Sequence, residues 1–222
     1  MTIKFYGFWR SLAAYRVRVA LKLKGLDYEE IPVNLLAGDQ HDPAYLKINP
    51  QGAVPALILE GVAQPLFQSM AILDYLDHAH PKPSLMPTQP SDRARVLALA
   101  HLCASDGHPL VVPRVRNYLQ NTLKLDEPVR NQWLQHWTLQ ALQSYERALS
   151  QDPRTGRYSH GDQITVADLC LASQVIGAGF FGCELVDLPR VTAINQALME
   201  HPAFSESMPS RQIDAPAPNP SH

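Results

Sequence analysis

Cysteine is scarce in this sequence, and neither a long apolar run nor an excess of one charge is present. The three cysteines among 222 residues, Cys103, Cys170 and Cys183, are odd in number and far apart, so they fit neither a disulfide framework nor a metal site. We therefore interpret them as small buried hydrophobic residues and expect no metal ligands. Lys plus Arg number 19 and Asp plus Glu 21, a formal net charge of −2, which excludes a general attraction to nucleic acid or to a membrane surface.

Targeting and membrane-spanning signals are also missing. Residues 1–6 lack the apolar core of a signal peptide, and no apolar stretch is long enough to cross a membrane. We therefore expect a cytoplasmic protein. Hydrophobic residues make up 45% and charged residues 18%, which is typical of a folded globular protein of one large or two modest domains.

The first third of the chain alternates between strand and helix patterns. Residues 3–8 form a short apolar and aromatic run typical of a buried strand, residues 14–24 have helical spacing and end at Gly25, and residues 28–33 suit a second strand. Such a strand–helix–strand unit is parallel and right-handed. The pattern therefore predicts an α/β sheet that begins at the N-terminus.

A hairpin and a second helix follow. Residues 56–59 and 64–67 flank a turn at Glu60-Gly61, and a helix begins at Ser69 and ends before Pro81. Together with the first unit, these elements predict a small α/β domain over residues 1–82.

The rest of the chain carries helical patterns. Prolines concentrate at residues 81–90, which we interpret as a linker, and at the C-terminal end. Helical stripes at residues 93–104 and 132–149 predict an all-helical domain over residues 90–208. Residues 209–222 read as a tail with little regular structure.

One local motif in the helical part has a structural interpretation. Residues 165–168, Thr-Val-Ala-Asp, form a variant of the capping box, in which Thr165 and Asp168 satisfy backbone groups at the start of a helix. We assign this motif no catalytic role.

Two candidate sites lie where strands meet helices in the first domain. Ser11 follows the first strand and precedes a helix, so it lies beside free backbone N–H groups that suit an anion, although simple helix capping explains a serine there as well. Gln68 and Ser69 offer the same arrangement at the second helix, with the same alternative.

A third candidate is Val54-Pro55, where a proline enters a strand. Pro55 cannot donate to a sheet, so it indicates an edge position or a cis bond, and a cis bond would turn the Val54 backbone outward to pair with a peptide-like ligand. An ordinary proline at a strand start is an equally good explanation.

In this order, the three features resemble the thioredoxin-like domain of glutathione transferases. Residues 15–25 look like the helix that follows the Ser-Ser-Cys motif of the zeta class, which includes maleylacetoacetate and maleylpyruvate isomerases. Asn49-Pro50, the capping box at 165–168 and residues 211–216 match that class too. The resemblance implies the glutathione transferase fold, an α/β thioredoxin-like N-terminal domain with an all-α C-terminal domain, in a homodimer.

The resemblance also implies a glutathione site. Gln68 and Ser69 would meet the γ-glutamyl carboxylate, the Val54 backbone before Pro55 would pair with the cysteinyl backbone, and Ser11 would hydrogen-bond the sulfur. The residues that it implies for glutathione are Ser11, Gln40, Val54, Pro55, Gln68, Ser69 and His108.

The chain departs from the class pattern at three positions. Leu12 and Ala13 replace the second serine and the cysteine of the motif, which leaves Ser11 for the sulfur unless Tyr6 or Tyr15 reaches it, and Tyr15 reads rather as a packed aromatic residue. Phe180 stands where the isomerases carry an arginine that grips the dicarboxylate substrate. A dicarboxylate needs cationic partners in a buried site, and we assign that role to two arginines, Arg10 and Arg114, with Arg10 also counted as catalytic.

The resemblance therefore predicts a glutathione-dependent cis–trans isomerase of maleylacetoacetate or maleylpyruvate, with a cis-enone dicarboxylate as its substrate. Two alternatives stay open at this point. One is a transferase or dehalogenase that acts on a less charged electrophile, which the Phe180 position favours. The other is a non-catalytic module that binds glutathione, which the Leu12 and Ala13 positions favour.

Overall fold

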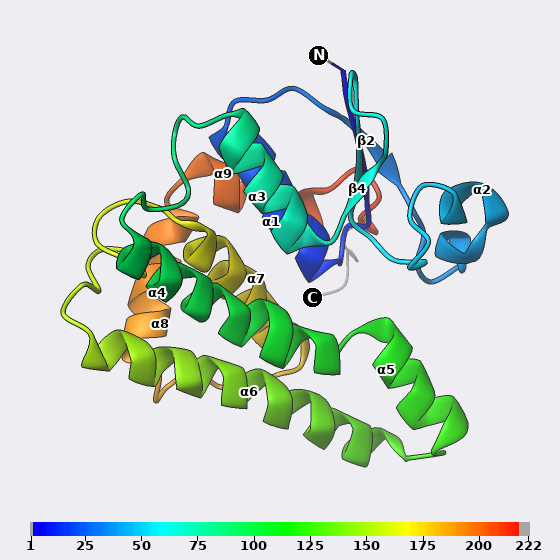
Figure 1. The fold of residues 1–222 in the computed structure, drawn as a ribbon. Helices are drawn as coiled ribbons and strands as arrows, with labels where there is room; N and C mark the ends of the chain where they lie inside the picture. Colours follow the sequence, from blue (N-terminus) through cyan, green and yellow to red (C-terminus); the bar gives the residue numbers. More distant parts are fainter. Residues whose placement is uncertain (1, 218–222) are drawn as a thin grey trace. The chain divides into compact units, whose positions relative to one another are not determined.

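The computed structural model describes residues 2–217, which belong to two compact units. Of these residues, the first unit contains 2–83 together with 202–217, and the second contains Ser84–His201. The first is an α/β unit and the second is helical (Figure 1). The predicted class, an α/β domain combined with an all-α domain, is therefore confirmed.

The first unit is built on a four-stranded mixed sheet in the order β2-β1-β3-β4. Strand β1 pairs parallel with β2 and antiparallel with β3, and β3 pairs antiparallel with β4. Strand β4 is shorter than the predicted residues 64–67, because Pro65 has no N–H to donate to the ladder. The strands are β1 (Ile3–Gly7), β2 (Glu29–Pro32), β3 (Ala56–Leu59) and β4 (Leu66–Phe67).

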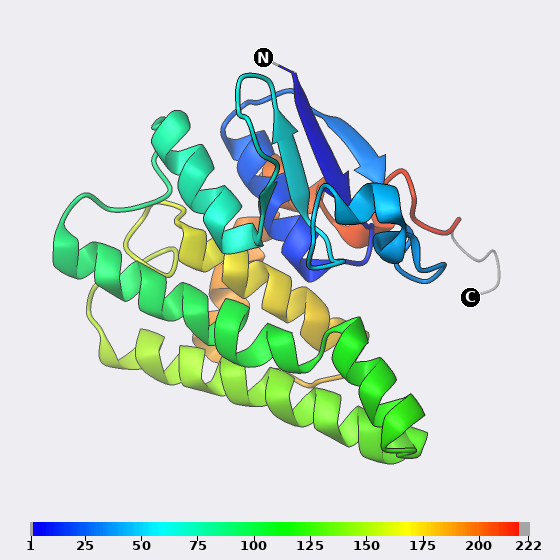
Figure 2. The same ribbon diagram turned by 45° about the vertical axis from the view of Figure 1, so that its right-hand side comes forward.

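Helices α1 (Leu12–Leu23) and α3 (Ser69–Ala79) lie side by side and begin at the same end of the first unit (Figures 1 and 2). Helix α1 begins two residues before the predicted range because Ser11 caps it, and it ends just before Gly25, whose φ of 62° favours glycine.

Between β2 and β3 lie the 3₁₀ helix η1 (Asp39–His41) and the short α2 (Pro43–Leu46).

The C-terminal segment completes the first unit. Helix α9 (Pro202–Ser205) supplies the buried Phe204, whose carbonyl accepts a hydrogen bond from the Tyr15 hydroxyl at 3.3 Å. The 3₁₀ helix η5 (Pro209–Arg211) follows. Residues 209–217, the described part of the predicted tail, belong to the first unit, where the Asp214 carboxylate accepts a hydrogen bond from the Trp9 N–H. Within the segment, the Gln212 side chain donates to the carbonyls of Glu206 and Met208.

The second unit is a set of helices whose core is formed mainly by α4, α6, α7 and α8. The longest, α6, spans 25 residues and buries Leu134, Leu142, Tyr145 and Leu149 on one face, as the predicted stripe requires. Its helices are α4 (Pro90–His101), α5 (Pro113–Asn117), α6 (Glu127–Gln151), α7 (Val166–Phe180) and α8 (Pro189–Met199), with η2 (Leu102–Gly107), η3 (His108–Leu110) and η4 (Tyr118–Thr122) as shorter π and 3₁₀ segments.

The predicted capping box at the start of α7 is present. The Asp168 carboxylate is fully buried and accepts hydrogen bonds from the Thr165 N–H at 2.8 Å, from the Thr165 hydroxyl at 2.9 Å and from the Ser159 N–H at 2.8 Å. Burial raises the pKa of Asp168, while these donors oppose the shift. Two of the donors are backbone N–H groups and the third is the Thr165 hydroxyl, which agrees with a structural role for Asp168.

Cys103 and Cys170 are buried, as expected, while Cys183 is half-buried after α7. Within residues 2–217, no cluster of potential metal ligands occurs. The same residues include no helix that combines the length and the apolar character of a membrane span.

Replacing Asp168 with alanine tests the capping box. The variant leaves three buried donors without their acceptor, so the free energy of unfolding should fall by about 3 kcal/mol. Denaturant unfolding measures this change. Asp162→Ala, which removes an exposed bond to the Arg157 N–H, is the control and should cost less than about 1 kcal/mol. Equal losses in the two variants would contradict the assignment.

Candidate active site

The junction between β1 and α1 presents a hydroxyl group beside a helix N-terminus. Ser11 is the N-cap of α1, and its Oγ accepts a hydrogen bond from the Ala14 N–H at 3.2 Å. The hydroxyl hydrogen is not used in this bond, so the same group can donate to a ligand. Ser11 is half-buried and its neighbour Arg10 is exposed. Ser11 can therefore cap the helix and bind an anion at once.

The two tyrosines considered beside Ser11 have other contacts. Tyr15 is fully buried, its hydroxyl donates to the Phe204 carbonyl, and burial raises its pKa far above the ordinary value. Tyr6 packs against Tyr45, with ring centroids 5.9 Å apart. The packed role expected for Tyr15 is confirmed, and among the motif side chains Ser11 alone offers a hydroxyl at the start of α1.

The segment before β3 presents a free backbone. The Val54–Pro55 peptide bond is cis, one of the two arrangements that the sequence left open. Val54 is half-buried, lies outside the β3 ladder, and its N–H and C=O bond to no group in residues 2–217. A buried backbone group normally has a partner. These two groups are therefore suited to pair with the backbone of a bound peptide.

The position of Val54 is set by its neighbour Ala53. The Ala53 carbonyl accepts two hydrogen bonds, from the Tyr45 hydroxyl at 2.6 Å and from the Asn49 side-chain amide at 2.7 Å. Both donors are buried, with exposed fractions of 6% and 1%, and burial raises the pKa of the Tyr45 hydroxyl. The segment that carries Val54 is therefore held in place by two buried side chains.

Helix α3 begins at Gln68 and Ser69 in an arrangement that leaves its N-terminus open. Gln68 is the N-cap, with a φ of 68°, and its side chain does not cap the helix but donates to the Gln51 side-chain oxygen at 2.7 Å. Ser69 is only 5% exposed, and its Oγ accepts a hydrogen bond from Arg16 at 3.2 Å. No side-chain cap from Gln68 covers the first turn, so the N-terminus of α3 and the Ser69 hydroxyl suit a carboxylate.

Gln40 lies in η1, close to the segment that precedes Val54. A Cβ added to Gly52 would lie 3.3 Å from the Gln40 carbonyl oxygen, so the two backbones are close together. The Gln40 side-chain oxygen is buried and has no hydrogen-bond partner among the described residues. An unpaired buried acceptor is unusual and suits a donor supplied by a ligand.

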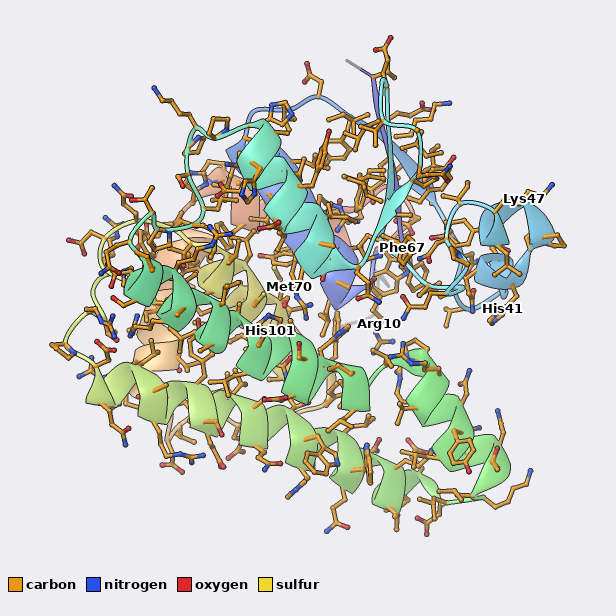
Figure 3. All side chains as sticks on the ribbon, in the orientation of Figure 1. Arg10, His41, Lys47, Phe67, Met70 and His101 are labelled. Atoms are coloured by element: carbon orange, nitrogen blue, oxygen red, sulfur yellow. The ribbon has the colours of Figure 1, made fainter. Side chains whose placement is uncertain are left out.

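These features of the first unit lie at one end of the sheet. Figure 3 shows Arg10 near the start of α1 and, near the start of α3, Phe67 and Met70, which flank Gln68 and Ser69. The Gln40 carbonyl lies close to the Gly52 backbone, and a hydrogen bond links Gln68 to Gln51. These neighbours connect the segments that carry Gln40, Val54 and Gln68.

The remaining predicted residues belong to the second unit. His108 begins η3 and is half-buried, Arg114 is exposed on α5, and Phe180 ends α7 half-buried. This unit also contains a cavity of about 450 Å³ whose lining includes Leu102, Leu110 and Trp137. None of the three predicted residues lines that cavity.

A bond from the C-terminal segment reaches the loop before Ser11. The Asp214 carboxylate accepts a hydrogen bond from the Trp9 N–H at 2.9 Å, across 205 residues of sequence. Trp9 and Arg10 form the link between β1 and the Ser11 cap. The end of the chain therefore holds the loop that carries the candidate anion site.

Comparison with known proteins agrees with this geometry. The family model of the glutathione S-transferase N-terminal domain matches residues 1–78. Maleylacetoacetate isomerase of Pseudomonas aeruginosa is 40% identical over 217 residues, which cover 97% of this chain and all of the relative. A solved holo structure of maleylpyruvate isomerase, described as a zeta-class bacterial glutathione S-transferase, is 39% identical with a TM-score of 0.92 and covers 96% of this chain and 100% of its own.

This chain belongs to the zeta class of the glutathione S-transferase family. A maleylacetoacetate isomerase of Methylobacterium extorquens AM1, solved with malonate and glutathione bound, is similar as well, at 45% identity and a TM-score of 0.93, covering 96% of this chain and 100% of that one. The predicted family and fold are therefore confirmed.

Sequence reasoning missed several residues that support the site of this zeta-class chain. Tyr45 donates a hydrogen bond to the Ala53 carbonyl beside Val54, and Gln51 accepts one from the Gln68 side chain. Neither Tyr45 nor Gln51 belongs to a sequence motif. The sequence pattern predicts only that Arg16 lies in a helix. Its place among apolar residues is a signal that could have indicated a buried partner. Asp214 had no local signal, because its partner Trp9 lies at the other end of the chain.

Asp214→Ala tests the contact between the C-terminal segment and the Trp9 loop. Loss of a charge-assisted hydrogen bond worth about 1.5 kcal/mol should make the Trp9 amide exchange hydrogen about tenfold faster. Hydrogen–deuterium exchange of the free protein measures this rate. Asp42→Ala, which removes the cap of α2, is the control and should leave the Trp9 amide unchanged. An unaltered Trp9 rate in Asp214→Ala would contradict the contact.

Proposed function

We propose that this chain is a glutathione-dependent isomerase that converts the cis double bond of maleylacetoacetate or maleylpyruvate to the trans form. The observation that carries the proposal is the set of open anion- and peptide-binding groups at Ser11, Val54 and Ser69. Relatives named for these two isomerase activities match along nearly the full length of the chain and support it. The proposal includes a role in aromatic amino acid catabolism in the cytoplasm.

The residues of the first unit fit glutathione. In this proposal Gln68 and Ser69 bind the γ-glutamyl carboxylate at the start of α3, where the positive end of the helix dipole favours a negative charge. The Val54 backbone before Pro55 pairs with the cysteinyl residue through its unpaired N–H and C=O. The unpaired side-chain oxygen of Gln40 receives a donor from the glycyl end of the tripeptide.

The second unit contributes His108 in the same proposal. His108 is half-buried at the start of η3, and its assignment as a contact to glutathione rests on the resemblance to the zeta class. It is the one glutathione residue that lies outside the α/β unit.

Bound glutathione supplies a thiolate that adds to one carbon of the cis double bond and leaves again after rotation about the resulting single bond. Ser11 accepts from the Ala14 N–H and donates its hydroxyl hydrogen to the sulfur position. The N-terminus of α1 adds a partial positive charge. Each unit by which these groups lower the thiol pKa favours the thiolate by about 1.4 kcal/mol.

Arg10 and Arg114 are proposed to bind the substrate carboxylates. Both side chains are exposed, one on the Ser11 loop and one on α5. A carboxylate that leaves water requires a cationic or hydrogen-bonding partner. Phe180 at the end of α7 cannot supply one, so the proposal places both charges on these arginines.

The activity is tested by turnover of maleylacetoacetate and of maleylpyruvate with and without glutathione. We expect conversion that requires the free thiol, so that S-methylglutathione binds without supporting turnover. Absence of glutathione-dependent conversion of both substrates would overturn the proposal.

Ser11 variants separate helix capping from catalysis. Ser11→Ala loses both the cap and the donor, while Ser11→Asp keeps the cap acceptor but places a negative charge against the thiolate. We expect turnover to fall about 10- to 100-fold in Ser11→Ala, because the thiol pKa rises by one to two units, and at least as far in Ser11→Asp. The ultraviolet absorbance of the bound thiolate measures the pKa. Unchanged turnover in both variants would remove Ser11 from the mechanism.

We also propose a homodimer, in which the α/β unit of one subunit packs against the helical unit of the other. Phe67 is 39% exposed beside the start of α3, and the cavity of the helical unit offers it the apolar side chains of Leu102, Leu110 and Trp137, within a lining that also includes Ser105, Asp106, Gln140 and Ser144. Burial of such surfaces favours association.

Light scattering of the purified protein tests the dimer. A chain of 24.7 kDa should show about twice that mass, and Phe67→Ser should shift the equilibrium toward the monomer. Phe181→Ser, at a half-buried position after α7, is the matched control. A monomeric mass at high protein concentration would contradict this part of the proposal.

A further inference from the structure

Helix α1 buries two arginines, which make different contacts. Arg16 is 1% exposed and Arg18 is fully buried. Arginine is rarely buried so far unless it is paired. Arg18 forms an ion pair with Glu30 on the neighbouring strand β2 and lies over the ring of Phe5 at 5.5 Å. These contacts hold β2 against α1 and account for Arg18.

Arg16 points instead to the start of the neighbouring helix. Its Nη1 donates to the Ser69 Oγ at 3.2 Å, and Ser69 is the first residue of α3. Both residues are buried, with exposed fractions of 1% and 5%, so little water screens the guanidinium charge. Helices α1 and α3 begin at the same end of the first unit, which lets a side chain one turn into α1 reach this point (Figure 2).

This contact determines what the Ser69 hydroxyl can do. A hydroxyl oxygen that accepts from a guanidinium keeps its hydrogen for another acceptor, and the guanidinium has no lone pair with which to take that hydrogen. The hydroxyl is therefore available as a donor at the N-terminus of α3. The buried positive charge also adds to the positive end of the helix dipole, since both favour an anion at the same place.

We propose that Arg16 is a positioning residue for the glutathione carboxylate. It holds the Ser69 hydroxyl as a donor and adds a buried positive charge behind it, so that the start of α3 selects ligands that carry the α-carboxylate of the γ-glutamyl group. The assignment rests on the proposed function, because it concerns the same site.

A pair of ligands tests this role. S-methylglutathione carries the α-carboxylate, and S-methyl-4-aminobutyryl-cysteinylglycine is the same molecule without it. Calorimetry on the full-length protein gives the ratio of their dissociation constants, which measures carboxylate selectivity separately from the rest of the tripeptide. In Arg16→Gln we expect the affinity for S-methylglutathione to fall about tenfold or more and that for the analogue less than about twofold.

Two further variants complete the experiment. Arg16→Lys keeps a positive charge and a long stem but loses the fixed donor geometry, so we expect a selectivity between those of the wild type and Arg16→Gln. Arg18→Lys is the matched control from the same buried face, and its ligand ratio should equal that of the wild type even where its stability is lower. In a Ser69→Ala background, substitution of Arg16 should have a smaller effect than in the wild type, because the two residues act together.

The outcomes separate this inference from the proposed function. A wild-type protein that binds neither ligand would overturn the proposed function itself. A wild type that prefers S-methylglutathione while both Arg16 variants keep the same ratio would overturn only the role of Arg16. If neither Arg16 variant folds, while Arg18→Lys does, Arg16 is a structural residue and the inference is also wrong.

Discussion

The hydrogen bond from the Ala14 N–H to the Ser11 Oγ is the interaction on which the rest of the site depends. It starts α1 directly after β1, so the hydroxyl stands at the positive end of a helix and keeps its hydrogen for a ligand. Because α1 begins there, its next turns carry Tyr15 and Arg16 into the core of the first unit. One serine thus connects the start of a helix, its packing and the proposed chemistry of the sulfur.

In the proposed function, the glutathione site relies on oriented donors more than on exposed cations. In the first unit the binding groups are helix N-termini, hydroxyls and the free Val54 backbone, and the charges that assist them are buried behind the surface, as Arg16 is behind Ser69. Such donors are fixed before a ligand arrives, so little reorganisation is needed when it binds. This arrangement explains how a chain with a net charge of −2 can offer several anion-binding positions.

Much of the fold could be predicted from the sequence, because its signals are local. Apolar runs, the cap at Ser11, the turn at Glu60-Gly61 and the capping box ending at Asp168 each lie within a few residues of the structure they determine. The candidate residues Ser11, Val54, Gln68 and Ser69 were found at the same kind of junction, whereas Gln40 was predicted only from the resemblance to the zeta class. Supports that cross the fold could not be predicted, since the contacts of Arg16 with Ser69 and of Asp214 with Trp9 require the tertiary structure.

The place of residues 202–217 in the first unit has a consequence for the order in which the protein forms. The sheet of the α/β unit precedes the helical unit in the chain, yet the carbonyl that receives the Tyr15 hydroxyl and the carboxylate that holds the Trp9 loop follow it. Domains generally fold as units during synthesis, the N-terminal one first. Here the contacts of the N-terminal sheet unit with residues 202–217 can form only after the whole helical unit has been translated.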